Sequence, residues 1–254
     1  MCSFTSANFC DQNLVSAISA LNGTLPRDQR VNSNDLVLSI DSLSHSYPLC
    51  QVMRALYANA SVALNSVAGE SVDFALATAG VSPTVIIASS HTVSDYHDKV
   101  MQPNSGFISS ISRWFQTRKL DAGIMPSHGF LNQASHIGAT SELSFDKLRL
   151  LCISHRCDAD PEVQLTYEQL TDLRIYTGAR LVYALTGPDV AGAITQTNVF
   201  DYRRFSGKSH FGSPLGSAEI FLTGAQEGGE ENRNAEGQVR YSPPIPLAIH
   251  FSDR

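Results

Sequence analysis

The chain has 254 residues, 43% hydrophobic and 17% charged, a composition typical of a globular protein with a substantial core. Its formal net charge of −6 argues against a nucleic-acid-binding surface, which needs clustered Lys and Arg. No apolar run approaches the ~20 residues of a bilayer span, so no transmembrane segment is expected. The N-terminus lacks the pattern of a secretory signal, and five irregularly spaced cysteines favour reduced thiols, so we expect a cytoplasmic location.

The first hundred residues alternate between helix and strand patterns. Helices are predicted at 9–21, 50–58, 72–79 and 91–101, and strands at 35–40, 60–64 and 84–89. Asp11 is a candidate N-cap for the first helix, and Gly80 is a good residue to close the third. The strand at 84–89 is the clearest because it begins with four β-branched residues. This alternation predicts βαβ units and a largely parallel sheet.

An amphipathic helix is expected after residue 106. Five apolar residues share one face of it, and basic residues lie near the other; the apolar set is Phe107, Ile108, Ile111, Trp114 and Phe115. Such a helix suits a membrane surface or the cover of an acyl pocket, but a core-facing helix with solvated basic residues is the favoured interpretation. Residues 126–141 are rich in small side chains and are expected to form a loosely packed helix near a ligand pocket.

The remaining elements complete an α/β pattern with a β-rich end. A strand is predicted at 148–153, a helix at 165–176 that Gly178 stops, a strand at 179–183, and a hairpin pairing 218–222 with 238–241 around an acidic loop at 227–236. Three prolines predict that the tail 242–254 is extended. We expect parallel-rich sheets flanked by helices over residues 1–190, and a smaller β-rich portion of the same domain over 191–254.

The best candidate for a ligand site is the end of the strand at 179–183. That apolar run stops at Thr186, Gly187 and Pro188, and loops at the ends of buried strands commonly hold ligands in α/β proteins. A buried strand followed by an ordinary turn is the alternative. A second polar segment, from His155 to Asp160, is interpreted as a polar strand-end loop rather than a nucleophile or metal site.

The order of these segments resembles the large N-terminal domain of the adenylate-forming ligases, the AMP-binding and acyl-CoA synthetase-like family. The resemblance covers roughly residues 4–244 and is carried by DLVLSIDSLSHSY, ASVALNSVAGESVDFALATAGVSPTVIIAS, LRLLCISHRCDADPEV, TGARLVYALTG, FGSPLGSAEIFL and EGQVRYSPP. It is specific in the order of the motifs and weak in identity at each one.

The resemblance implies an ATP-dependent activation of a carboxylic acid as acyl-adenylate, with ATP and Mg²⁺ as cofactors. By this comparison Tyr183 would stack on adenine, the Thr186 hydroxyl would meet the α-phosphate, and Gly187 would complete the nucleotide site. His45 would border the acyl carboxylate. Ser154 and His155 would occupy the small loop of the substrate pocket.

The sequence departs from the family at several catalytic positions. Gly187 stands where the family has a magnesium-binding Glu, so no metal ligand is assigned. The phosphate-binding loop with its Lys would precede Phe4, and the family's C-terminal domain with the catalytic Lys would follow the last residue. Asp253 is a weak match to the ribose-binding Asp.

Three hypotheses follow, and catalytic residues are left unassigned. The first is a ligase-like domain, truncated at both ends, that is weak or inactive alone. The second is a non-catalytic protein that binds a nucleotide or acyl molecule, or a partner protein. The third is a piece of a longer protein whose apolar surface favours self-association.

Overall fold

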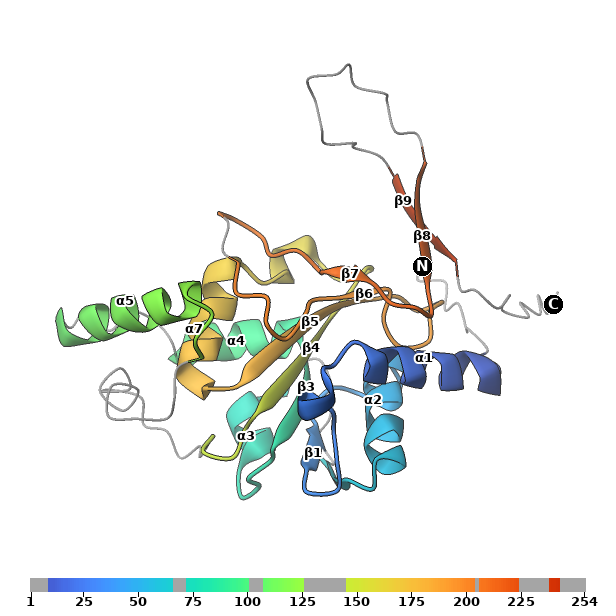
Figure 1. Ribbon diagram of the computed structural model, residues 1–254, viewed down its shortest axis with the longest axis horizontal. Coiled ribbons are helices and arrows are strands. Elements are labelled where there is room, and N and C mark those ends of the chain that lie inside the picture. The colour runs from blue at the N-terminus through green and yellow to red at the C-terminus, as the bar shows by residue number, and fades with distance from the viewer. Residues whose placement is uncertain are drawn as a thin grey trace, which may run out of the picture.

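The structure is a computed structural model that describes residues 9–65, 72–100, 107–125, 145–203, 206–223 and 238–242. Its centre is a seven-stranded sheet with the strand order β2-β1-β3-β4-β5-β6-β7 (Figure 1). The strands are β1 (Leu36–Ser39), β2 (Ser61–Leu64), β3 (Val85–Ser89), β4 (Leu150–Arg156), β5 (Arg180–Thr186), β6 (Thr195–Gln196) and β7 (Ser213–Pro214). The first five in this order run parallel, and β6 and β7 add antiparallel at one edge. The predicted α/β fold class with a largely parallel sheet is confirmed.

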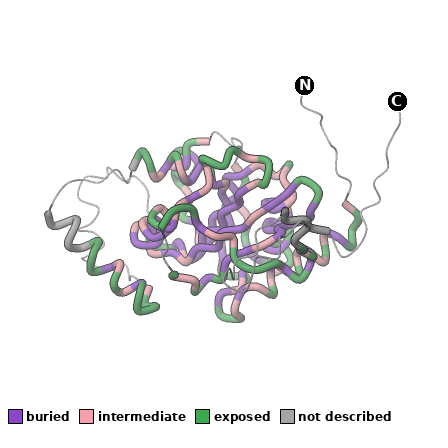
Figure 2. Tube along the Cα trace, turned by 90° about the horizontal axis from the view of Figure 1, so that it is seen from above, coloured by how far each residue is buried: buried purple, intermediate pink, exposed green. Residues whose placement is uncertain are grey.

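Helices cover both faces of this sheet. The α-helices are α1 (Asp11–Gly23), α2 (Ser46–Tyr57), α3 (Phe74–Thr78), α4 (Ser90–Val100), α5 (Phe107–Asp121) and α7 (Tyr167–Thr177). Two single 3-10 turns, η1 (Arg27–Gln29) and η2 (Pro161–Val163), interrupt the loops. The buried side chains form two apolar clusters, one between the sheet and α1 and α2, and the other between the sheet and α3, α4 and α7. The buried residues lie in the interior of the molecule, between exposed segments on its outside (Figure 2).

The alternation of side chains along the central strands assigns residues to these two clusters. In β4, Leu150 and Cys152 face α1 and α2, whereas Leu151 and Ile153 face the opposite layer. The four residues from Leu150 to Ile153 are fully buried, because a parallel sheet covered on both faces has no solvent side. This explains why the sequence shows a continuous apolar run there rather than an alternating one.

The predicted hairpin near the end of the chain is also confirmed. Strands β8 (Glu219–Thr223) and β9 (Gln238–Ser242) pair antiparallel, from Glu219 with Ser242 to Thr223 with Gln238. They form a separate two-stranded sheet that projects from the main body (Figure 1). The predicted acidic loop between them, the segment 126–141 and the tail after residue 242 lie outside the described residues.

Two predicted helix starts are wrong. Helix α1 has Cys10 rather than Asp11 as its N-cap, and the Asn13 side chain accepts a hydrogen bond from the Cys10 backbone N–H at 3.2 Å. Helix α2 begins at Ser46, four residues before the predicted start, with His45 as its N-cap. Pro48 lies in the first turn, where proline is tolerated because the N–H groups there have no helical partner.

The expected orientation of α5 is wrong where its side chains are described. Trp114 and Phe115, placed on the core side by the sequence pattern, are 58% and 46% exposed. The helix instead buries Gln116 and Leu120, which are one turn apart, and it contacts α7. Arg118 and Lys119 lie over the exposed Trp114 and Phe115 rings, at 4.8 and 5.2 Å from the ring centroids. None of the helices within the described residues has the length and hydropathy of a membrane span.

An ion pair fastens the amino end of the sheet. Arg149 Nε and Nη2 donate to the two carboxylate oxygens of Asp35 at 2.7 and 2.6 Å, and Asp35 is 4% exposed. Burial raises the pKa of Asp35, but hydrogen bonds from Arg149, the Asn32 backbone N–H and Thr84 outweigh it and leave that pKa below its usual value. The pair joins the residue before β1 to the residue before β4, so it holds together strands distant in sequence.

We therefore expect Asp35→Asn to destabilise the fold by about 2–3 kcal/mol, because it leaves the Arg149 charge without its carboxylate. Because the pKa of Asp35 is lowered in the folded protein, the Asp35–Arg149 pair stabilises the wild-type fold fully above about pH 4. This stabilisation is lost as the pH falls through the folded pKa of Asp35. Urea unfolding at several pH values measures both effects. The matched control Lys99→Met removes an exposed pair with Asp73, and we expect it to cost less than about 1 kcal/mol. Equal costs for the two variants would contradict this role of Asp35.

Candidate functional site

The candidate site lies at the carboxyl edge of the parallel strands. This edge is where doubly wound α/β sheets bind ligands, because the strands end there and the loops diverge. In this chain β1, β3, β4 and β5 end in polar residues rather than apolar ones: Ser39, Ser89, Ser154 to Arg156, and Thr186. The parallel register places Ser89 beside Ser154, and Arg156 beside Thr186.

A buried carboxylate organises one part of this edge. Asp41 follows β1 and is 1% exposed. Its Oδ2 accepts a hydrogen bond from Ser154 Oγ at 2.9 Å, and its Oδ1 accepts one from the Ser42 backbone N–H at 2.7 Å. His45 Nδ1 lies 3.2 Å from the same Oδ1. Asp41 thus joins two predicted pocket residues, His45 and Ser154, and the sequence analysis did not identify it.

Arg156 extends this cluster toward solvent. Its Nε and Nη2 donate to the two oxygens of Asp158 at 2.9 and 2.6 Å, and its Nη1 lies 3.0 Å from His45 Nε2. The pKa of Asp158 is lowered, mainly by the hydrogen bond from Arg156. Since a guanidinium can only donate, His45 Nε2 must accept, and the ring proton belongs on Nδ1, directed at Asp41. The set of Asp41, His45, Arg156 and Asp158, called the edge cluster below, is therefore a continuous polar chain.

His155 belongs to a different environment. Its Nδ1 lies 3.0 Å from Ser90 Oγ, and its ring stacks on Phe211 with a centroid distance of 5.2 Å and an interplanar angle of 22°. His155 is 6% exposed. Burial lowers the pKa of His155, and the positive charge of Lys208 lowers it further, which favours the neutral imidazole.

Tyr183 lies on the same side of the sheet as His155. It is 1% exposed, its ring centroid is 4.9 Å from that of Phe211, and its hydroxyl accepts a hydrogen bond from the Leu165 N–H at 3.1 Å. Gly212 permits this approach of Phe211: its φ is +78°, and a Cβ there would overlap the Gln196 carbonyl. A planar ligand could reach the Tyr183 face only if Phe211 moved away.

Thr186 and Gly187 mark the end of β5. The Thr186 hydroxyl donates to the His155 carbonyl at 3.2 Å, and Thr186 is 5% exposed. Gly187 is buried, and its carbonyl accepts from the Val190 N–H at 3.3 Å in the turn that follows. Both residues are held in internal contacts.

Four of the six predicted site residues thus divide into two sets on opposite sides of the sheet, and the other two, Thr186 and Gly187, lie at the end of β5. Every second residue of β4 faces the same side, so Ser154 and Arg156 lie on the face of Cys152, toward α1 and α2. His45 contacts Arg156 on that face. His155 and Tyr183 follow Ile153 and Leu181 toward the α3, α4 and α7 layer. The structure joins His45 to Ser154 through Asp41, and it joins His155 to Tyr183 through Phe211.

The residues present do not fit a magnesium site. Within the described ranges no group of three His, Cys, Asp or Glu side chains is placed to hold a metal ion. Position 187 has no side chain, and the nearby carboxylates of Asp41 and Asp158 are already engaged by hydrogen bonds from protein groups. A hard cation prefers several oxygen ligands, so this edge does not supply them.

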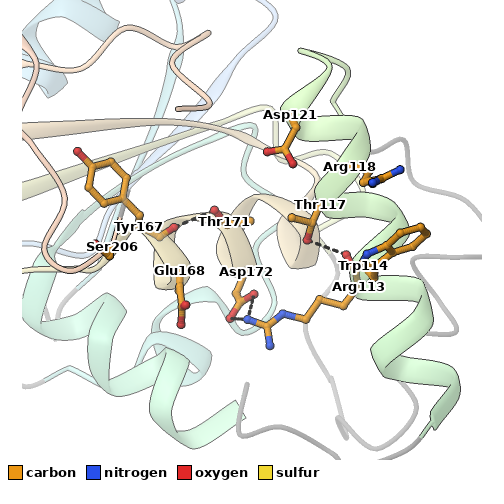
Figure 3. A pocket seen from close by; sticks show the side chains of 10 residues that line it. All are labelled: Arg113, Trp114, Thr117, Arg118, Asp121, Tyr167, Glu168, Thr171, Asp172 and Ser206. Atoms are coloured by element: carbon orange, nitrogen blue, oxygen red, sulfur yellow. Dashed lines mark hydrogen bonds and ion pairs between the residues drawn. The ribbon is translucent and has the colours of Figure 1, made fainter. Parts of the chain in front are cut away.

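A separate groove of about 810 Å³ lies between α5 and α7 (Figure 3). Arg113 crosses it to Asp172, with a shortest N–O distance of 2.7 Å, and Asp172 also lies 3.3 Å from His97 Nε2. The predicted site residues are not among its lining residues, so it is distinct from the carboxyl edge.

The fold of this chain is similar to part of several solved ligase structures. Benzoate CoA ligase from Burkholderia xenovorans LB400 is similar over 96% of this chain and 39% of its own, with 14% identity and a TM-score of 0.55. O-succinylbenzoate coenzyme A synthetase from Bacillus subtilis, in complex with AMP, is similar over 94% and 37%, with 12% identity and a TM-score of 0.54. The N-terminal domain of FACL13 from Mycobacterium tuberculosis is similar over 95% and 48%, with 11% identity and a TM-score of 0.53.

The fold expected from the order of the sequence segments is therefore confirmed. At these identities the likeness is one of fold, and the chain spans between about a third and a half of the length of these solved structures. No protein-family model matches the sequence, and no curated protein matches it.

The hydrogen-bond geometry predicts the tautomer of His45. At about pH 8, where free imidazoles are neutral, the ring ¹⁵N shifts should show a protonated Nδ1 and an unprotonated Nε2. Arg156→Met should weaken this preference because it removes the donor to Nε2. His210, whose Nδ1 accepts a hydrogen bond from the Gly212 N–H at 2.9 Å, is the control and should show the opposite tautomer, with an unprotonated Nδ1. A protonated Nε2 on His45 in the wild-type protein would contradict the assignment.

The lowered pKa of His155 predicts a pH-dependent stability. Between its folded pKa and its ordinary value of 6.5 the unfolded chain binds more protons, so stability falls as the pH falls through this interval. Replacing His155 with Gln should flatten this part of the stability profile, measured by urea unfolding. His91→Gln should leave it unchanged, because no comparable burial acts there. An unaltered slope in His155→Gln would show that another group causes the dependence.

Proposed function

We propose that this chain is a ligase-type domain that binds an acyl or adenine-nucleotide ligand at the carboxyl edge of its sheet and makes little or no acyl-adenylate alone. The observation that carries the proposal is the match of nearly the whole chain to AMP-binding ligase domains, with a polar edge at the corresponding strand ends. In this proposal Tyr183, Thr186 and Gly187 form the nucleotide side. His45 and Ser154 form the acyl side, on the face of the sheet covered by α1 and α2, whereas His155 lies on the opposite face beside Tyr183.

The chemistry of the edge supports binding more strongly than catalysis. Adenylate formation develops charge on a transferring phosphoryl group, and a metal ion or fixed donors must stabilise that charge. Gly187 offers no metal ligand, and Tyr183 and Thr186 are buried in contacts within the protein. ATP and magnesium therefore belong to the proposal only through the resemblance, and no step is assigned to them here.

The second candidate is a non-catalytic protein that retains a binding site. The enclosure of Tyr183 by Phe211 favours this candidate, since the aromatic face proposed for adenine is covered by another side chain. In that case the edge cluster, rather than the nucleotide side, would contact the ligand. His45 contacts the buried Asp41 directly and still has 26% of its side chain exposed.

A thermal-shift comparison tests the proposed ligand binding. A ligand at 100 times its Kd stabilises the folded state by about 2.7 kcal/mol, which corresponds to roughly 5–10 °C for a chain of this size. We expect a shift with at least one of AMP, ATP, coenzyme A, benzoate or a fatty acid. If the nucleotide side is correct, Thr186→Val should reduce the shift given by a nucleotide. Thr78→Val is the matched control, because Thr78 is equally buried at 5% but lies on α3.

A second assay separates binding from catalysis. The purified chain should show no ATP–pyrophosphate exchange above background with the same carboxylic acids. Exchange by the wild-type chain would overturn the proposal of low activity. The absence of any thermal shift would overturn the proposal of binding.

A further inference from the structure

Residues 53–65, which run from the last turns of α2 through β2, present a surface without exposed charge. The one charged residue in this stretch, Arg54, is buried at 2% exposure. Four large apolar side chains in the same stretch are exposed: Met53 at 45%, Leu56 at 53%, Tyr57 at 81% and Leu64 at 65%. These four residues are called the edge patch. Such a grouping is informative because large apolar side chains gathered on one surface usually mark an interaction site.

Helical spacing places three residues of the edge patch together. Met53, Leu56 and Tyr57 are related as i, i+3 and i+4, so they lie on one side of α2. The inward side of the helix instead carries Cys50 and Ala55, both fully buried. The outward side of α2 is therefore apolar without being part of the core.

Strand β2 brings the fourth residue to the same layer. Val62 packs against the cluster that contains α1 and α2, whereas Ala63 packs against the opposite cluster. Since side chains alternate along a strand, Leu64 points to the same face as Val62, which is the face covered by α2. The edge patch is thus shared by α2 and β2, which contact each other.

Strand β2 also has an open edge. It pairs with β1 on one side, and it is the terminal strand of the sheet formed by the described residues. Exposed edge strands are usually protected by charged residues, proline or a bulge. The sequence of β2 is Ser-Val-Ala-Leu, which contains no charge or proline, and its register with β1 is regular.

We propose that the edge patch and the open edge of β2 bind a second copy of this chain, through antiparallel pairing of β2 with β2 about a twofold axis. A twofold axis perpendicular to the sheet makes the two edge strands antiparallel and keeps both α2 helices on the same face. Each α2 would then meet the other copy's Leu64 and α2. The two sheets would become continuous.

The chemistry of the surface favours a second copy over a charged partner. An uncharged apolar surface is complementary to itself, and it offers no ion pair to a partner of opposite charge. The exposed aromatic residues of α5 differ, because cations cover both of their rings. Pairing two copies through the edge patch brings no exposed charge of this stretch into contact, so the net charge of −6 does not oppose it locally.

Sedimentation equilibrium over a concentration series tests this interface. The wild-type chain should show a reversible monomer–dimer equilibrium. Leu64→Lys should raise the dimer dissociation constant at least tenfold, because it places a charge within the apolar contact. Ile124→Lys is the matched control, since Ile124 is 58% exposed and follows α5, which among the described residues contacts α7 and not β2, and it should leave the constant unchanged. Leu64 is largely exposed, so both variants should fold, which circular dichroism confirms.

A second measurement does not depend on a variant. Amide hydrogen exchange of a peptide containing residues 61–64 should slow as the protein concentration rises, because pairing protects the outer N–H groups of β2. A wild-type chain that stays monomeric throughout the series would overturn the proposal. Equal weakening by Leu64→Lys and Ile124→Lys, or a dimer with unchanged exchange in β2, would also overturn it. Neither experiment requires a nucleotide or an acyl ligand.

Discussion

The parallel ladder between β4 and β5 determines how the rest of the molecule is arranged. It pairs seven residues of each strand, from Leu150 with Arg180 to Arg156 with Thr186. Because every second side chain crosses to the other face, this register assigns each buried residue of the two strands to one of two apolar clusters. A shift by one residue would exchange the two sets and bury Ser154 and Arg156 among α3, α4 and α7.

The same alternation continues into the polar edge and divides the chemistry there. On one face, Asp41 is buried. Its negative charge needs hydrogen-bond donors from the protein, since burying an isolated carboxylate costs free energy. Ser154 and the Ser42 N–H compensate it directly, and His45 connects it to Arg156 and the half-exposed Asp158. The edge cluster thus links a buried negative charge to solvent through alternating charges and donors. On the other face, His155 is buried among aromatic rings, where a neutral imidazole is favoured.

Local patterns were sufficient to predict the five parallel strands and the final hairpin, but not the short antiparallel strands β6 and β7. The β-branched run in β3 and the stop at Gly178, which adopts φ +64°, are examples in which local preference and tertiary structure agree. Asp41 could not be identified, because its importance depends on Ser154, 113 residues away. Likewise, adjacency in sequence placed Ser154 and His155 in one pocket, although neighbouring residues of a strand face opposite ways. The order of the motifs was sufficient to predict the fold. The distribution of polar groups at the carboxyl edge depends instead on the pairing register of the strands.

The helices show a second reason why sequence patterns mislead in this fold. Both α2 and α5 bury polar residues and expose large apolar ones: Arg54 and Gln116 are buried, whereas Leu56 and Trp114 are exposed. Arg54 donates to the Leu21 carbonyl at 3.2 Å, which ties α2 to α1. Its interior position is therefore set by a polar contact between helices and not by hydrophobic burial.

That arrangement leaves apolar residues of α2 on the outer surface for a physical reason. Only a few positions of a helix face inward. When a long polar side chain occupies one of them, fewer inward positions are left for apolar residues. In α2 the residues displaced in this way adjoin an edge strand without protective charges, and the two features together form the edge patch. In α5 the displaced aromatics are covered by Arg118 and Lys119. The difference between these two helices is the reason for placing an interface at β2 rather than at α5.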